Sequence, residues 1–112
     1  MDQIDIKKQS EEIGIDVQAL LSLYNLFTDQ TETDMNQLKV LISEKNAKEV
    51  KDIAHHIKGA CLNLELLSMV EQAKEMEKLA ISEDWETLLS VHSLFSSDLF
   101  VLKEMLSRVE HE

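Results

Sequence analysis

Mostly apolar residues recur at three- and four-residue steps between Asp16 and Lys45, and this spacing constrains the fold more than any other feature. The stripe consists of Leu20, Tyr24, Phe27, Thr31, Met35, Leu38, Leu41 and Ile42. Residues at these steps share one face of an α-helix. With Asp16 as a good N-cap, the pattern predicts one long helix of roughly 28 residues. Asn46 then reads as a helix stop or a short turn before a new start at Ala47.

The rest of the chain continues the helical pattern. A weakly amphipathic N-terminal segment, residues 1–14, ends at Gly14 and predicts a short first helix laid on the others. After a turn over residues 65–68, a shorter helix is marked by Met69, Val70, Ala73, Met76 and Ala80. Ser82 is the expected cap of the last helix. The stripe of that helix is Trp85, Leu88, Leu89, His92, Phe95, Leu99, Leu102, Leu106 and Val109.

The composition leaves little material for strands or long loops. The chain of 112 residues has no proline and two glycines, and 44% of its residues are hydrophobic. We therefore expect one all-α domain over residues 1–112. Four long helices joined by short turns pack up and down, so residues 16–108 are expected to form an antiparallel four-helix bundle with the short N-terminal helix added.

Charge and hydropathy exclude several kinds of partner. The net charge of −11 argues against nucleic-acid binding, because neutralising phosphates requires clustered lysines and arginines. No apolar run approaches the ~18 residues of a membrane span, and the start MDQIDIKKQS has no apolar centre of a signal peptide. We expect a cytoplasmic monomer that binds neither nucleic acid nor membrane.

The segment from Val50 to Leu64, VKDIAHHIKGACLNL, has two contrasting sides when wound as a helix. The side expected to be buried carries Val50, Ile53, Ile57, Cys61 and Leu64. The other side carries His55, Lys58, Gly59, Leu62 and Leu66. Helix propensity does not explain this second side, since a glycine inside a helix costs about 1 kcal/mol relative to alanine. Such violations of local rules are expected at functional sites.

The exposed side suits the handling of a phosphoryl group. A neutral imidazole with a pKa near ~6.5 is a competent nucleophile. Lys58, one turn after His55, offers a positive charge to phosphoryl oxygens. Gly59 lets another protein approach the imidazole closely. Leu62 and Leu66 would add apolar area for docking.

These residues carry a resemblance to a known family. His55, Lys58 and Gly59 reproduce the H-x-x-K-G core of histidine-containing phosphotransfer (HPt) domains, and the run from Ala54 to Ala60 resembles the fuller A-H-x-[LI]-K-G-[SA] pattern. The similarity spans roughly residues 16 to 108, and Met76-Glu77 matches a family L-E pair with methionine in place of leucine. The chain departs from the family at Glu65, where a glycine is common.

The resemblance implies an all-helical bundle whose histidine relays a phosphoryl group between receiver-domain aspartates. His55 would accept the group as a phosphoramidate, and the partners would be response-regulator receivers or a hybrid sensor kinase. No G-x-x-x-x-G-K-[ST] loop or kinase-like glycine-rich segment occurs, so we expect no ATP binding, no kinase activity and no cofactor or metal of its own. Any Mg²⁺ in the reaction would belong to the receiver.

The bundle also predicts the neighbours of His55. If the chain reverses between Leu66 and Leu67, the residues opposite His55 on the next helix are Glu77 and Lys78. Glu77 would accept a hydrogen bond from Nδ1 and leave Nε2 free for attack. Lys78 would add positive charge. The competing interpretation is that both are ordinary surface charges.

Two other histidines have simpler explanations than catalysis. His56 lies 100° round the helix from His55 and is expected at the edge of the buried face, and His92 is expected as a hydrogen-bonded core histidine.

Two other functions remain open. A bundle metal site would need Glu-x-x-His motifs, and the chain offers only Asp52 and His56 at a four-residue spacing. An HPt-like bundle could instead act only as an interaction module, without phosphotransfer.

Overall fold

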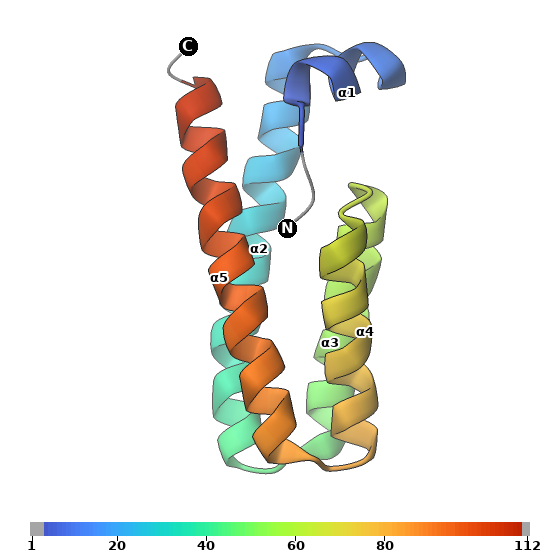
Figure 1. Ribbon diagram of the computed structural model, residues 1–112, viewed down its shortest axis with the longest axis vertical. Coiled ribbons are helices and arrows are strands. Elements are labelled where there is room, and N and C mark those ends of the chain that lie inside the picture. Colours follow the sequence, from blue (N-terminus) through green and yellow to red (C-terminus); the bar gives the residue numbers. More distant parts are fainter. Residues whose placement is uncertain (1–3, 111–112) are drawn as a thin grey trace.

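The computed structural model describes residues 4–110, and within that range it contains five helices and no strand. The helices are α1 (Ile6–Ile13), α2 (Val17–Ser43), α3 (Ala47–Asn63), α4 (Leu67–Ile81) and α5 (Trp85–Glu110) (Figure 1). The all-helical prediction is confirmed over this range. Residues 1–3 of the predicted N-terminal segment lie outside it.

Helices α2 to α5 lie side by side along the long axis of the molecule, and short turns join them at its ends (Figure 1). Helix α2 packs against α3 and α5, and α4 also packs against α3 and α5. Helix α1 packs against α2 across one end. In the described range, no helix is both long and apolar enough for a membrane span. Helix α3 thus packs against α2 and α4 and leaves its remaining face exposed.

The ends of α1 and α2 follow from their sequence. The Asp16 carboxylate accepts a hydrogen bond from the Gln18 amide, so Asp16 caps α2 as predicted. Gly14 ends α1 in the left-handed conformation (φ 82°), which glycine adopts without steric cost. The expected short first helix and long second helix are therefore both present.

The three turns between the long helices share one backbone feature. Each contains a single non-glycine residue in the left-handed region, namely Lys45, Glu65 and Glu83, with φ values of 55°, 56° and 57°. Asn46 acts as the N-cap of α3, where its side chain accepts from the Glu49 amide. The expectation that Ser82 caps the last helix was wrong.

Ser82 ends α4, and the cap of the last helix lies two residues further on. The Asp84 carboxylate accepts from the Thr87 amide at the start of α5. The reason is the left-handed residue at position 83, which separates the end of one helix from the start of the next.

The core is aliphatic, with Tyr24 and Phe95 as its largest fully buried side chains. It includes Leu66, which is 1% exposed, so the prediction of an exposed docking leucine at position 66 was wrong. Helix α3 stops at Asn63, and the left-handed residue Glu65 reverses the chain. The helical extrapolation that placed Leu66 near His55 therefore fails, and the side chain turns inward. Cys61 is buried as expected.

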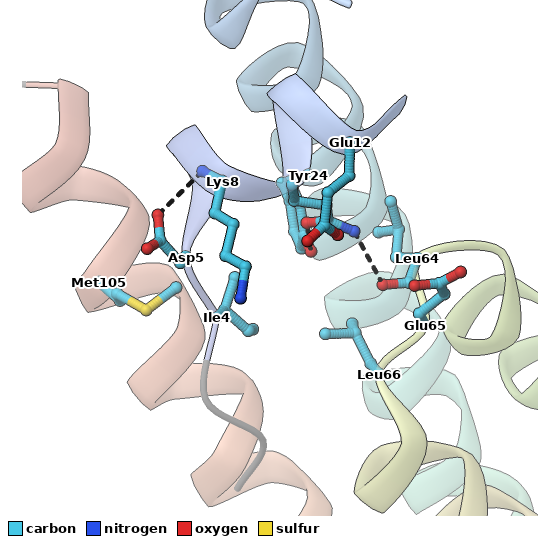
Figure 2. A pocket seen from close by; sticks show the side chains of 10 residues that line it. Ile4, Asp5, Lys8, Glu12, Tyr24, Leu64, Glu65, Leu66 and Met105 are labelled. Carbon is cyan, nitrogen blue, oxygen red and sulfur yellow. Dashed lines mark hydrogen bonds between the residues drawn. The ribbon is translucent and has the colours of Figure 1, made fainter. Parts of the chain in front are cut away.

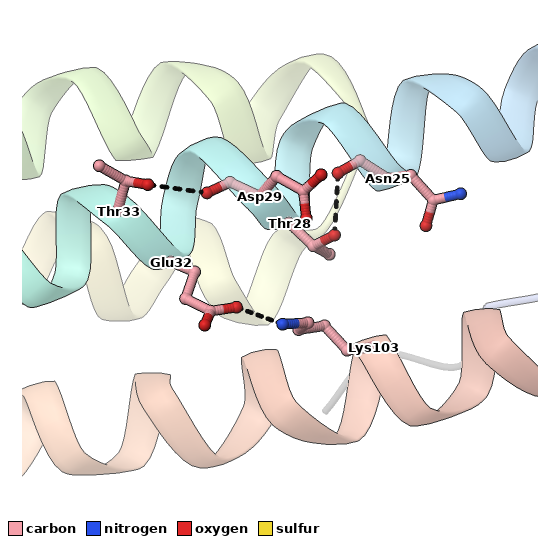
Figure 3. A network of polar contacts seen from close by, with 6 residues as sticks. All are labelled: Asn25, Thr28, Asp29, Glu32, Thr33 and Lys103. Carbon is pink, nitrogen blue, oxygen red and sulfur yellow. Dashed lines mark hydrogen bonds and ion pairs between the residues drawn. The ribbon is translucent and has the colours of Figure 1, made fainter.

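Polar contacts tie α5 to its neighbours. Lys103 pairs with Glu32 of α2 (Figure 3), and this hydrogen bond raises the pKa of Lys103 above its usual value. Gln72 of α4 donates to Asp98 at 2.8 Å. His92 lies half-buried with Nε2 at 2.8 Å from the Met35 carbonyl oxygen of α2, which confirms it as a hydrogen-bonded core histidine. These contacts fix α5 against α2 and α4 on the side of the bundle away from α3.

Gln9 of α1 forms hydrogen bonds with α2 and with the turn that follows α3. The Gln9 side chain accepts from the Tyr24 hydroxyl at 2.7 Å and lies 3.5 Å from the Leu64 carbonyl oxygen, to which it donates. Gln9 also lines a hollow of about 670 Å³. The hollow lies between α1, the α3–α4 turn and Met105 of α5 (Figure 2). Of the predicted site residues, Leu66 alone lines this hollow.

Candidate functional site

His55 lies in the middle of α3 with its side chain 67% exposed. Its Nδ1 atom is 3.2 Å from Oε2 of Glu77 on α4. A carboxylate can only accept, so this contact selects the tautomer with the proton on Nδ1. The unprotonated nitrogen is then Nε2, which keeps a lone pair for a nucleophilic attack.

Lys58 reaches the same carboxylate oxygen as His55. Its Nζ atom is 3.1 Å from Oε2 of Glu77, and its side chain is 28% exposed. One glutamate from α4 thus holds two side chains of α3. The close approach of α3 and α4 makes this possible, and Glu77 occupies the level that the predicted hairpin assigned to it.

The electrostatics of Glu77 reflect its two partners. Partial burial by itself raises the pKa of this carboxyl group, but hydrogen bonds and charge attraction from Lys58 and His55 outweigh it and lower the pKa below the usual value of 4.5. Glu77 is therefore ionised at neutral pH. Its charge offsets much of the positive charge of Lys58.

Gly59 opens the surface next to His55. A Cβ atom added to this glycine would meet nothing within 4 Å, so no neighbour inside the domain requires a glycine here. A shallow hollow of about 450 Å³ adjoins it, lined by His55, His56, Gly59, Ala60, Leu62 and Asn63. Leu62 is 57% exposed at its edge. The surface of α3 beside the imidazole is therefore open to a second protein.

The side chains of Lys78, the second predicted neighbour of His55, and of the adjacent His56 form no ion pair or hydrogen bond with Glu77 in the described structure. Lys78 is exposed, lies 100° further round α4 than Glu77, and forms no ion pair with any residue of the range 4–110. His56 is exposed, so the expectation of a partly buried position was wrong. It lines the hollow together with His55. The buried residues of α3 are Val50, Ala54, Ile57 and Cys61, and both histidines lie well outside the face that these residues form.

The described part of the chain contains no cluster of side chains suited to a metal site. No group of three or more His, Cys, Asp or Glu side chains between residues 4 and 110 is placed to hold a metal ion. Asp52 instead pairs with Lys48, with 3.2 Å between Oδ2 and Nζ.

The charge of α3 differs from that of its neighbours. Of the five described helices, α3 alone has more basic than acidic residues, with three lysines against two acids. One of them, Lys51, lies one turn before His55 on the same face. Lys51 is not among the site residues predicted from the sequence, although its four-residue spacing from His55 can be read there.

Comparison with known proteins gives one match. The family model described as Hpt domain matches residues 22–112. No curated protein and no solved structure gives a significant match. The matched range includes all of α3 to α5 and most of α2, and therefore every residue of the site described above.

Proposed function

The chain belongs to the Hpt domain family, and on that premise we propose that it is a histidine phosphotransfer protein of a two-component phosphorelay. Hpt domains are phosphocarrier modules and not kinases. In this proposal His55 accepts a phosphoryl group from the aspartate of one response-regulator receiver and passes it to another. A receiver within a hybrid sensor kinase is an equally suitable donor. The fold is proposed to be the antiparallel four-helix bundle α2–α5, with α1 added at its N-terminal end.

The transfer step follows from the tautomer of His55. The Nε2 lone pair attacks the phosphorus atom, the P–O bond to the receiver aspartate breaks, and its electron pair leaves with the aspartate carboxylate. The Nδ1 proton stays on the ring, so the ring becomes positively charged as the P–N bond forms. Glu77, 3.2 Å from Nδ1, stabilises that charge and keeps the ring oriented. The same steps in reverse order transfer the phosphoryl group from His55 to the aspartate of a second receiver.

The other residues have supporting roles in this proposal. Lys58 meets the phosphoryl oxygens, and its ammonium is already held at the level of the imidazole by Glu77. Gly59 leaves room for the aspartyl loop of the receiver. Leu62 supplies apolar docking area. Lys78 adds positive charge at the margin of the docking surface.

The observation that carries the proposal is the arrangement of two side chains, His55 and Lys58, on the Glu77 carboxylate. An exposed histidine, hydrogen-bonded through Nδ1 and flanked by a lysine on the same carboxylate, is prepared for attack through Nε2. A domain that only binds partners has no need of this arrangement. The interaction module without phosphotransfer remains the alternative to be tested.

A pair of adjacent variants tests the assignment. Phosphorylated receiver domains are incubated with wild-type protein, with His55→Gln and with His56→Gln, and label transfer is followed. We expect His55→Gln to accept no phosphoryl group and His56→Gln to accept it nearly as well as wild type, because His56 has no Glu77 contact. The label on wild type should be acid-labile and base-stable, as for a phosphoramidate. Transfer to His55→Gln would overturn the assignment, and a wild type that binds receivers without accepting label would favour the interaction module.

A further inference from the structure

The phosphohistidine proposed above brings more negative charge than the site, as described so far, can balance. A phosphoryl group on Nε2 carries a charge of about −1.5 to −2 near pH 7. The imidazole ring gains one positive charge in the transfer and Lys58 supplies another, but the ionised Glu77 offsets one of the two, so the sum stays negative. Glu77 also stays at the ring after phosphorylation and repels the phosphoryl oxygens. A second cation within reach would remove this imbalance.

Lys51 has the right place on the helix for that role. It precedes His55 by four residues, and Lys58 follows His55 by three, so the three side chains lie along one face of α3. Side chains four apart have Cβ atoms about 5–6 Å from each other. In addition, helical side chains lean toward the helix N-terminus, so the imidazole of His55 extends over the turn that contains Lys51.

Lys51 also has a free charge. The other two lysines of α3 are engaged, Lys48 with Asp52 at 3.2 Å and Lys58 with Glu77 at 3.1 Å. Lys51 forms no ion pair or side-chain hydrogen bond with any residue of the described range, and its side chain is half-buried. Its ammonium therefore loses no partner when it turns toward a new anion. The four-methylene side chain gives it the freedom to do so.

We propose that Lys51 is a second phosphoryl-binding residue, which contacts the phosphoryl oxygens on His55 from the N-terminal side while Lys58 contacts them from the C-terminal side. This inference rests on the proposed function, because it needs a phosphoryl group on His55. It assigns a role to a residue outside the H-x-x-K-G motif. Lys51 then stabilises the phosphorylated form of the protein itself, whether or not a receiver is bound.

The test compares Lys51→Gln with Lys48→Gln. Lys48 is the matched control, because it lies on the same helix one turn further from His55 and is paired with Asp52. Each variant and the wild type are equilibrated with a phosphorylated receiver, and the equilibrium distribution of label is measured. The phosphoprotein is then separated from the receiver, and the ³¹P resonance of its phosphohistidine is followed against pH. Thermal unfolding confirms that the variants are folded.

For Lys51→Gln we expect the equilibrium to shift toward the phosphorylated receiver by about five-fold, the scale of one lost charge contact near a surface. The ³¹P resonance should titrate at higher pH than in wild type, because a nearby positive charge favours the dianion. Lys48→Gln should leave both quantities close to wild type. Because the receiver is absent from the ³¹P measurement, a shift in this titration cannot come from docking.

Three other outcomes would overturn the inference in different ways. If Lys51→Gln only raises the receiver concentration needed for half-maximal rate, with an unchanged ³¹P titration, Lys51 is a docking contact. If neither quantity changes, Lys51 is a solvated charge. If the wild type accepts no label, the proposed function fails, and the role of Lys51 fails with it.

Discussion

At the scale of single residues, the site depends on one carboxylate that holds two side chains, the imidazole of His55 and the ammonium of Lys58. Glu77 has one oxygen atom 3.2 Å from His55 Nδ1 and 3.1 Å from Lys58 Nζ. Because both partners come from α3 and the glutamate from α4, the contact also joins two helices. Removal of this carboxylate should therefore affect both the orientation of the imidazole and the stability of the fold.

Glu77→Gln should be less stable than wild type at pH 7, and the difference in free energy of unfolding should depend on pH. The folded pKa of Glu77 is below the usual 4.5, so its stabilising effect is fully present above about pH 5 and declines as the pH falls through the folded pKa. The difference should therefore shrink between pH 5 and pH 3. Urea unfolding at several pH values measures it.

The control for this variant is Glu75→Gln, which changes an exposed glutamate of the same helix that forms no ion pair within residues 4–110. It should show little difference from wild type at any pH. A Glu77→Gln difference that stays constant from pH 7 to pH 3 would mean that the ion pairs do not contribute to stability. Phosphoryl transfer to Glu77→Gln should also be slower, since the amide no longer offsets the positive charge on the ring.

At the scale of secondary-structure elements, α3 contains a glycine that weakens it. Gly59 is exposed, helical and without a neighbour that a Cβ would touch, so its cost to the helix has no structural compensation. We expect Gly59→Ala and Gly59→Gln each to raise the free energy of unfolding by up to about 1 kcal/mol. Chemical denaturation is the measurement.

Function should change in the opposite direction in the same two variants. The long glutamine side chain would occupy the surface beside His55 that the receiver loop needs, so we expect Gly59→Gln to slow transfer by at least about ten-fold. The small alanine side chain should slow it much less. A Gly59→Gln variant that folds and transfers normally would show that close approach at this position is not required.

The helices follow more directly from the sequence than the turns do. Periodicity and caps predicted α1, α2 and the level of Glu77 opposite His55, because helical geometry converts spacing directly into position. The turns are harder to predict from the sequence. Glu65 and Glu83 adopt left-handed conformations that local sequence does not mark, since glutamate is uncommon there. The errors at Leu66 and Ser82 both follow from these unmarked residues.

At the scale of the whole molecule, the distribution of charge matters more than its sum. The net charge is −11, yet basic residues outnumber acidic ones on α3. The molecule measures 42 × 22 × 18 Å, so charges on the far helices lie further from a partner at α3 than the screening length of about 8–10 Å in physiological salt. Under those conditions a docking receiver interacts mainly with α3 and with the charges of α4 next to it.

This predicts an unusual dependence of the transfer rate on salt. With an acidic receiver, the rate constant at low receiver concentration should rise as salt increases from about 10 mM to about 100 mM, because repulsion by the whole molecule is screened first. It should then fall toward 500 mM as the attraction of α3 is screened. Rapid-quench measurements across this range test it. A rate that only rises with salt would show that α3 does not attract the receiver.

The contrast between α3 and the other helices also means that the molecule has an electric dipole moment with its positive end at the site. In the field of an acidic surface such a body rotates before it makes contact. The faces formed by α2, α4 and α5 are turned away, and the face with His55 is turned toward the partner. The excess of acidic residues elsewhere on the molecule thus limits the wrong orientations that a receiver has to sample before it reaches the histidine.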